Sequence, residues 1–288
     1  MSIDLNRADA SPIAKTRRDP GAPRGVLRRH LGPGTFRHDR LAPGSALADW
    51  LEHFWCVRWD MGAAPPQVQE TLPHPNVHLV VEAGRTAVWG VHEGRFRREL
   101  AGCGLVFGVK FKAGAFRPWF GRPVSQLVNR SASLAEVFGG ACQALETQVL
   151  TAGDMAAMAA TMERFLRPRC PPPNPQAAWV AHIVAGIVHD RDLTRVEALA
   201  QRCGVSPRAL QRLFNDYVGI GPKWVIKRYR MHDAIERLQH GAPVDWPALA
   251  QELGYFDQAH FIRDFKRLVG RTPAAYARAE AAGAAKGG

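Results

Sequence analysis

The sequence lacks any paired cysteine motif. Its five cysteines are odd in number and scattered, and no CxxC pair occurs among them. This distribution argues against both a disulfide framework and a structural zinc knuckle. Long apolar runs are also missing, so no stretch is expected to span a bilayer. Residues 1–25 carry no apolar core of the kind that a secretory signal needs. We therefore expect a cytoplasmic protein without a membrane partner.

Metal ligands in a useful spacing are equally scarce. The most tempting histidines are His74, which lies between two prolines, and His78, which lies in a predicted strand. No His-x-His pair and no neighbouring set of carboxylates completes a metal site around them. We expect these histidines either to make structural hydrogen bonds or to line a small-molecule pocket with Glu82 and Trp89. No metal site, cofactor or catalytic residue is predicted.

Acidic residues are in short supply relative to basic ones. The 288 residues include 38 Lys and Arg but only 26 Asp and Glu, which gives a formal net charge of +12. A basic balance suits a polyanionic partner without naming it, and the alternative is a basic surface that serves solubility. The length allows two domains with separate cores, and 46% hydrophobic residues is the content of an ordinary folded protein.

Short strands dominate the first half of the chain. Residues 1–25 are rich in Arg, Asp, Pro and Ala without periodicity, which predicts a disordered basic arm. Residues 26–166 are expected to form a β-rich domain with a helical end, because apolar runs are bounded there by Gly and Pro. The predicted strands are Phe54–Trp59, Val77–Glu82, Ala87–Val91 and Leu105–Phe111. The last alternates as a half-buried strand does, and the set predicts a small barrel or sandwich.

Two helices and a linker are expected at the end of this domain. Ser133 with Glu136 three residues later has the pattern of a capping box. A second helix is predicted from about Asp154. Residues 167–176 are rich in proline, which predicts a semi-rigid, extended linker. We place the domain boundary there.

The most informative stretch is Asp245–Tyr276. A segment with helical spacing ends at Gly254, because glycine tolerates the left-handed conformation that a sharp turn needs. Asp257 is placed to cap the next helix, and Gly270 ends it. A helix, a glycine turn and a second helix with a basic outer face form the plan of a helix-turn-helix unit.

The same pattern occurs about fifty residues earlier. The matched positions, earlier copy first, are Ala198–Gln201 with Ala248–Gln251, Gly204 with Gly254, and Phe214 with Phe265. The turn is one residue longer in the second copy. Between the copies, Pro222–Leu238 reads as one long helix. An internal repeat of this kind predicts an all-α module with two helix-turn-helix units.

Residues 177–280 resemble the C-terminal DNA-binding module of the AraC/XylS family of transcription regulators. The second unit carries the resemblance in Gly254-Tyr255, Asp257–Phe261, Phe265–Arg267, Gly270 and Thr272-Pro273. Tyr255 stands where phenylalanine is usual. Thr71–Glu82 and Gly108–Leu127 resemble a poorly characterised N-terminal domain found in a subset of these regulators. The resemblance implies an α+β multidomain protein: a small barrel- or sandwich-like domain with helices, then an all-α double helix-turn-helix domain, with a flexible tail at 281–288.

The outer faces of the two reading helices are the predicted DNA-contacting surfaces. Arginine suits guanine, glutamine and asparagine suit adenine, and small apolar groups suit thymine methyls. The predicted base contacts are Arg208, Gln211, Arg212 and Asn215 in the first unit, and Gln258, Ala259, His260, Ile262 and Arg263 in the second. The predicted phosphate contacts are Ser206, Lys223, Arg228, Lys266, Arg267, Arg271 and Thr272. A solvated polar face is the alternative, and for Arg228 a structural role stays open.

We therefore predict a sequence-specific, DNA-binding transcription regulator and not an enzyme. The resemblance implies double-stranded DNA as the partner, with RNA polymerase, a second copy of the chain and an unidentified small-molecule effector as further ones. One alternative is a ligand-independent DNA binder whose N-terminal domain only dimerises. Another is an enzyme fused to a DNA-binding module, such as the alkyl-transferring repair regulators. Those need a zinc-held reactive cysteine near the N-terminus, whereas the first cysteine here, Cys56, has no cluster around it.

Overall fold

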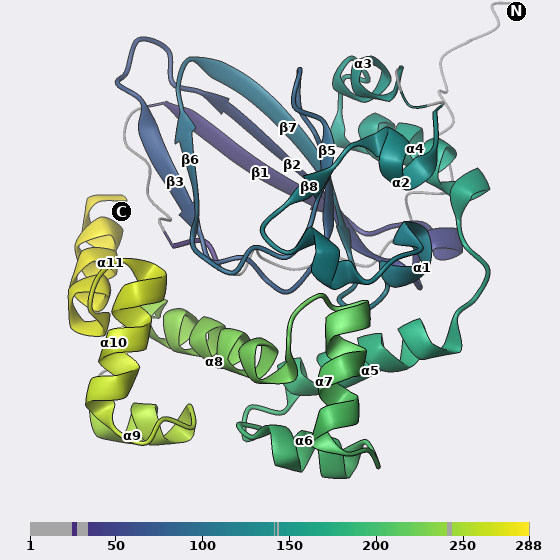
Figure 1. Cartoon of the computed structure of the whole chain (residues 1–288). Coiled ribbons are helices and arrows are strands. Elements are labelled where there is room, and N and C mark those ends of the chain that lie inside the picture. The colour runs from purple at the N-terminus through teal and green to yellow at the C-terminus, as the bar shows by residue number, and fades with distance from the viewer. Residues whose placement is uncertain (1–24, 28–33, 141, 143, 241–243, 288) are drawn as a thin grey trace, which may run out of the picture.

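The computed structural model describes residues 25–27, 34–140, 142, 144–240 and 244–287, with side chains up to residue 282. The predicted arm at 1–25 lies outside this range except for Gly25, whose carbonyl oxygen accepts a hydrogen bond from the Leu72 amide at 2.8 Å. Strands occupy the N-terminal half of the chain and helices the C-terminal half (Figure 1). This is the predicted α+β arrangement.

Two antiparallel sheets form the N-terminal domain. The larger has the strand order β1-β2-β7-β4-β5-β8, and the smaller pairs β3 with β6. In chain order the strands are β1 Thr35–Leu41, β2 Leu51–Asp60, β3 Gln67–Thr71, β4 His78–Val81, β5 Ala87–Trp89, β6 Phe96–Leu100, β7 Cys103–Phe111 and β8 Ser131–Ala132. All four strands predicted from the sequence are present, within a few residues of their expected bounds.

Strand β7 is buried on both faces, so the prediction of a half-buried strand is wrong. One face contributes Phe107 and Val109 to the main core. The other face lies under the smaller sheet, and Val106 packs there with Leu100 of β6. The small residue in the alternating pattern is explained by packing and not by exposure to solvent. A Cβ added at Gly108 would lie 2.1 Å from a ring carbon of Trp55, so only glycine fits there.

Four helices cover the main-core face of the larger sheet (Figure 1). They are α1 Arg117–Phe120, α2 Leu134–Phe138, α3 Leu145–Leu150 and α4 Met155–Leu166, with the short 3-10 turns η2 Ser45–Leu47 and η3 Val124–Leu127 beside them. The predicted capping box is confirmed, since Ser133 and Glu136 each accept a hydrogen bond from the other's backbone amide. The second helix begins where it was predicted, and Asp154 caps it by accepting a 2.8 Å bond from the Ala157 amide.

The proline-rich segment is only partly extended, which corrects the prediction of a non-helical linker. Its first residues form the 3-10 turn η4 Arg167–Arg169, and α5 Pro175–His189 begins inside its C-terminal end. Asn174 caps α5 by accepting a 2.8 Å bond from the Ala177 amide. Ala177 in turn packs into the main core of the N-terminal domain. The main core of the N-terminal domain thus includes a residue that lies beyond this segment. The structure does not place a domain boundary at 167–176, which stays a prediction.

The C-terminal half is all-α and contains the two predicted helix-turn-helix units. The helices after α5 are α6 Val196–Arg202, α7 Pro207–Tyr217, α8 Pro222–Gln239, α9 Trp246–Glu252, α10 Gln258–Val269 and α11 Pro273–Gly287. Each unit has its own apolar core, and α8 runs between them (Figure 1). Residues 281–287, predicted as a flexible tail, continue α11 instead.

Candidate nucleic-acid interface

The first reading surface lies on α7. Ser206 caps the helix, because its hydroxyl oxygen accepts a 3.2 Å hydrogen bond from the Ala209 amide, and Pro207 is the first helical residue. Leu210 and Phe214 are fully buried in the core of the first unit. The opposite face carries the four predicted base-contacting side chains, all exposed: Arg208, Gln211, Arg212 and Asn215. The structure therefore gathers them on one accessible surface.

The second reading surface lies on α10 and is less polar. Asp257 caps this helix through a 2.6 Å bond from the His260 amide, as predicted. Phe261 and Phe265 are fully buried, whereas Leu268 is half-buried. Of the predicted base-contacting residues, Ala259 and Arg263 are exposed, and Gln258, His260 and Ile262 are half-buried. Arg263 and Ala259 are thus the side chains most accessible to a base edge.

Asp264 neutralises part of the positive charge around α10. Its carboxylate accepts a 3.3 Å bond from Lys227 of α8 and a 3.1 Å bond from Arg267. Burial works to raise the pKa of Asp264, but the bonds from Arg267 and Lys227 outweigh it and hold this pKa below its ordinary value. Arg267 is therefore held by a carboxylate through one nitrogen, and its other N–H groups remain for a phosphate.

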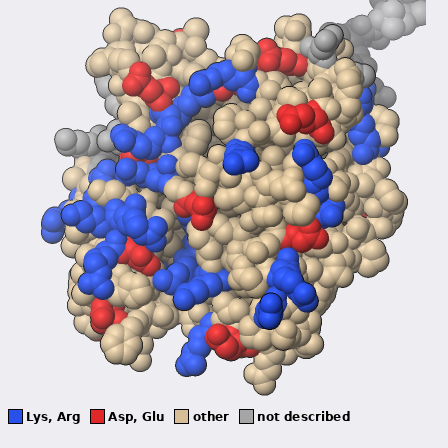
Figure 2. Space-filling model, viewed as in Figure 1, with Lys and Arg blue, Asp and Glu red and all other residues tan. Residues whose placement is uncertain are grey.

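The predicted phosphate contacts are mostly accessible. Lys223, Lys266 and Arg267 are exposed, and Arg271 is half-buried. The Thr272 hydroxyl accepts a 3.3 Å bond from the Ala275 amide at the start of α11. Figure 2 shows Lys and Arg side chains gathered over the region of α10 and α11, with further groups toward α7 and α8. A polyanion can meet positive charge from both units on this face.

Arg228 is the exception, and the prediction that it contacts phosphate does not hold in this structure. Its side chain is only 2% exposed. It donates hydrogen bonds to the carbonyl oxygens of Pro73, at 3.2 Å, and of Glu93, both in the N-terminal domain. Burial, followed by the nearby charge of Arg267, lowers the pKa of Arg228 to about 9. The structural alternative for this residue is the correct one.

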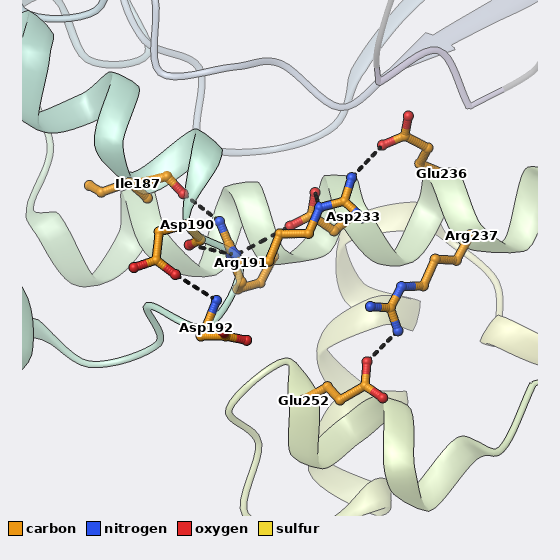
Figure 3. Close-up of polar contacts among 9 residues, drawn as sticks. Ile187, Asp190, Arg191, Asp192, Asp233, Glu236, Arg237 and Glu252 are labelled. Carbon is orange, nitrogen blue, oxygen red and sulfur yellow. Dashed lines mark hydrogen bonds and ion pairs between the residues drawn. The ribbon is translucent and has the colours of Figure 1, made fainter.

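Helix α8 ties the two units together through buried and surface charges (Figure 3). Arg230, 1% exposed, donates to the carbonyl oxygens of Ile187 and Asp190 at the end of α5. Near the C-terminal end of α8, Arg237 pairs with Glu252 of α9. Arg191 adds ion pairs of 3.7 Å to Asp233 and to Glu236. The relative placement of the two reading helices therefore depends on α8.

The N-terminal domain contacts both units as well as α8. Arg117 of α1 donates to Asp216 of α7 at 2.8 Å. Arg95, just before β6, donates to the carbonyl oxygen of Val269 at the end of α10, at 2.7 Å. Leu27 and Leu72 are buried in the core of the second unit. Any rearrangement of the N-terminal domain can therefore change how the two reading helices are presented.

The four residues predicted to line a ligand pocket do not come together, which corrects that prediction. The His74 ring stacks on the ring of His232 in α8, which belongs to the C-terminal half, with ring centroids 4.0 Å apart. It also lies 5.6 Å, centroid to centroid, from the ring of Tyr229. His74 thus belongs to the junction between the two halves of the protein.

The other three predicted pocket residues lie on the sheets. His78 accepts a 3.2 Å bond from the indole nitrogen of Trp55, which is the structural role that the sequence left open. Trp89 is the register partner of His78 and is 45% exposed. Glu82 pairs with Arg98 of β6 at 2.7 Å. Only His78 and Trp89 are neighbours.

Neither a metal site nor a membrane-spanning helix is found in the part of the chain that the structure describes. Within it, no three or more His, Cys, Asp or Glu side chains are grouped in a way that can hold a metal ion. No helix among these residues is long and apolar enough to cross a membrane.

Sequence reasoning missed two residues near the interface. Arg95 reaches the end of α10 through contacts that no local pattern encodes. Phe256, next to the cap of α10, is 95% exposed. The sequence did carry a signal for Phe256. The second turn is one residue longer than the first, so it holds one side chain that has no equivalent position in the first unit.

Two protein-family models match the chain. A model described as a Helix-turn-helix domain matches residues 199–279, and the model Domain of unknown function (DUF6597) matches residues 39–133. The first covers both reading helices, and the second covers most of the larger sheet.

Curated relatives match over the C-terminal module. The HTH-type transcriptional regulator GlxA of Rhizobium meliloti is 38% identical over 89 residues, which are 31% of this chain and 27% of that protein. The regulatory protein PocR of Salmonella typhimurium is 34% identical over 90 residues, 31% of this chain and 29% of the relative. The chain thus spans less than a third of the length of these relatives.

Among solved structures, the C-terminal domain of AraT, a response regulator from Geobacillus stearothermophilus, is similar to this chain with 28% identity and a TM-score of 0.32. The similarity covers 37% of this chain and 86% of that one.

Proposed function

We propose, starting from the AraC-type helix-turn-helix module that this chain contains, that the protein is a sequence-specific DNA-binding transcription regulator. Its two units would read two adjacent major-groove segments of double-stranded DNA. The observation that carries this proposal is the pair of exposed faces on α7 and α10. Each helix is capped and follows a glycine turn, and each contacts α8, α7 through a shared apolar core and α10 through the bond between Asp264 and Lys227. Helix-turn-helix proteins place an amphipathic helix of this kind in the major groove, where its N-terminal residues contact the base edges.

The first unit supplies most of the hydrogen-bonded specificity in this proposal. Arg208 and Arg212 suit guanine, because a guanidinium makes two hydrogen bonds to its O6 and N7 atoms. Gln211 and Asn215, now 2.9 Å apart and bonded to each other, have side-chain amides that suit adenine. In the second unit, Arg263 reads a base edge. Gln258, Ala259, His260 and Ile262 contribute shape and apolar contacts.

Phosphate contacts set the register of both units on the DNA. The exposed amines and guanidiniums of Lys223, Lys266 and Arg267, with Arg271 at the edge, are placed for this role. The helix starts at Ser206 and Thr272 add backbone amides. These contacts raise affinity without reading sequence, so their loss weakens binding to every DNA alike.

Regulation acts through the N-terminal domain in this proposal. A small-molecule effector there would favour one arrangement of the reading helices over another, which is a population shift. Support comes from the contacts of Arg117 with the first unit, of Arg95 with the second and of Arg228 with the N-terminal backbone. A second copy of the chain and RNA polymerase are the further partners that we propose. If the N-terminal domain serves only dimerisation, no small molecule will raise the melting temperature.

Selection of binding sites from random DNA, with the full-length protein at fixed salt, tests the proposal. We expect an enriched motif with two blocks roughly 10 bp apart, because reading helices in successive major grooves are separated by one helical turn. One block alone would assign specificity to a single unit. Absence of any enriched motif would contradict sequence-specific binding.

A further inference from the structure

The turns of the two units differ by one residue, and that residue is Phe256. In the first turn the amides of Gly204 and Val205 donate to the carbonyls of Gln201 and Ala200, each at 3.1 Å. In the second turn the equivalent Gly254 and Tyr255 amides make the equivalent bonds, each at 2.9 Å. Ser206 then caps α7 directly, whereas Phe256 stands between Tyr255 and the cap of α10. Phe256 has no counterpart in the first unit.

The fold leaves the Phe256 side chain unused. A residue just before a helix cap often packs against the fourth helical residue, which here is Phe261. Tyr255 makes that contact instead, with ring centroids 5.5 Å apart, and Phe261 is fully buried. Phe256 is 95% exposed, about twice the exposure of Phe96, which at 47% is the next most exposed large apolar side chain in the described residues. Isolated apolar side chains on surfaces are common, but few project so completely.

The position of Phe256 selects its partner. The N-terminal residues of a reading helix are those that reach base edges in the major groove. Phe256 precedes the Asp257 cap, and Ala259, also exposed, lies two residues inside the helix. Together they form an apolar tip at the start of α10. The apolar group that the major groove offers is the C5-methyl of thymine, against which a phenyl ring packs well.

We propose that Phe256 is a specificity-determining residue that recognises a thymine methyl group in the DNA segment read by the second unit. This inference rests on the proposed DNA-binding function. It adds a residue that the polar faces of the reading helices do not account for. It also explains why the second reading helix is poorer in hydrogen-bonding side chains than the first: part of its selectivity comes from apolar contact.

The test uses the full-length protein and the DNA site enriched from random sequence. Each thymine in the second block is replaced in turn by deoxyuridine, which removes only the methyl group, and dissociation constants are measured by fluorescence anisotropy at fixed salt. One replacement is expected to weaken wild-type binding by about 5-fold, a loss near the lower end of that for a mismatched base pair. Phe256→Ala is expected to lose the same factor and to be insensitive to that replacement.

Two further variants serve as controls. Phe96→Ala removes an exposed phenyl ring of the N-terminal domain and is expected to keep both the affinity and the response to deoxyuridine. Phe256→Leu keeps an apolar side chain and is expected to keep part of the preference for thymine. Since Phe256 is almost fully exposed, its variants should melt at the temperature of the wild type.

Three results would overturn the inference. Unchanged binding by Phe256→Ala would mean that the ring does not touch DNA and is exposed for a protein partner. Equal weakening on every sequence, with the response to deoxyuridine intact, would assign the ring to the sugar-phosphate backbone. If the wild-type protein had no sequence preference, the proposed function would fail together with this inference. That failure differs from the other two, because it is seen in the wild-type protein without any variant.

Discussion

The guanidinium of Arg228 in α8 donates a hydrogen bond to the carbonyl oxygen of Pro73, 3.2 Å away, across the junction between the N-terminal domain and the helix-turn-helix module. A second bond from the same side chain reaches the carbonyl of Glu93. A residue of the helix that connects the two reading units is therefore part of the domain junction. Arg228 therefore joins the backbone of the N-terminal domain to the helix that lies between the two helix-turn-helix units.

Replacing Arg228 with Ala should destabilise the protein by about 2–4 kcal/mol, because two carbonyl groups at a buried junction lose their donor. The shift is measured as a lower midpoint of urea unfolding. Arg212→Ala is the matched control, because it removes an exposed arginine and should change stability by less than about 0.5 kcal/mol. Similar midpoints for the two variants would contradict the structural role of Arg228.

Arg212→Ala should instead weaken binding to the specific site by about 1–3 kcal/mol and relax the preference at one base pair. The reason is that a guanidinium bonded to a base discriminates among bases, while one bonded to phosphate does not. Binding isotherms on the specific site and on its single-base variants measure both effects. An equal loss on all sequences would move Arg212 to the list of phosphate contacts.

The salt dependence of DNA binding separates Lys223 from Arg228. Each phosphate contact releases about one counterion, so Lys223→Ala should reduce the slope of log K against log salt by about 1. Arg228→Ala should leave that slope unchanged, because its side chain is buried in the junction. The slopes are measured on non-specific DNA across a salt series. If Lys223→Ala left the slope intact, Lys223 would not contact phosphate.

Phe265→Ala should destabilise the second unit by about 3–5 kcal/mol, because it empties a fully buried site. Ile262→Ala, at the edge of the same core, should cost only about 1–2 kcal/mol, since Ile262 is half-buried. Urea unfolding followed by circular dichroism measures both. A stable Phe265→Ala variant would mean that the orientation of α10 is wrong.

Two histidines of the N-terminal domain make stability depend on pH. Burial, with Lys110 and Arg40 nearby, lowers the pKa of His53 to about 2, although the Glu52 carboxylate lies 3.6 Å away. Burial and Lys110 lower the pKa of His78 to about 3. Because both values lie below the ordinary one, the unfolded chain binds protons that the folded chain refuses once the pH falls below about 6.5.

The contribution of these two histidines to stability should therefore be constant above about pH 7 and fall toward pH 5 by about 1 kcal/mol per pH unit for each. Urea midpoints measured across this range test the prediction. The double variant His53→Gln and His78→Gln should reduce the dependence and leave the part that comes from His38, whose pKa burial also lowers. His182→Gln, at an exposed position, should not reduce it. A pH profile that the double variant leaves unchanged would assign the effect to other groups.

Much of the local structure followed from the sequence because its causes are local. Ser133 and Asp257 cap the helices that they were expected to cap. Gly254 and Gly270 have positive φ at the ends where the pattern required it. The exposed face of α7 could be predicted for the same reason, since helical spacing alone separates Arg212 from Phe214.

The tertiary structure decided what depends on segments far apart in the chain. Arg228 meets Pro73 across 155 residues, and His74 meets His232, so no pattern within one helix separates these buried side chains from solvent-facing ones. The same reason applies to β7, whose second face is covered by a sheet that other segments build. Spacing determines which side of a helix or strand a residue occupies, but only packing determines what lies against that side.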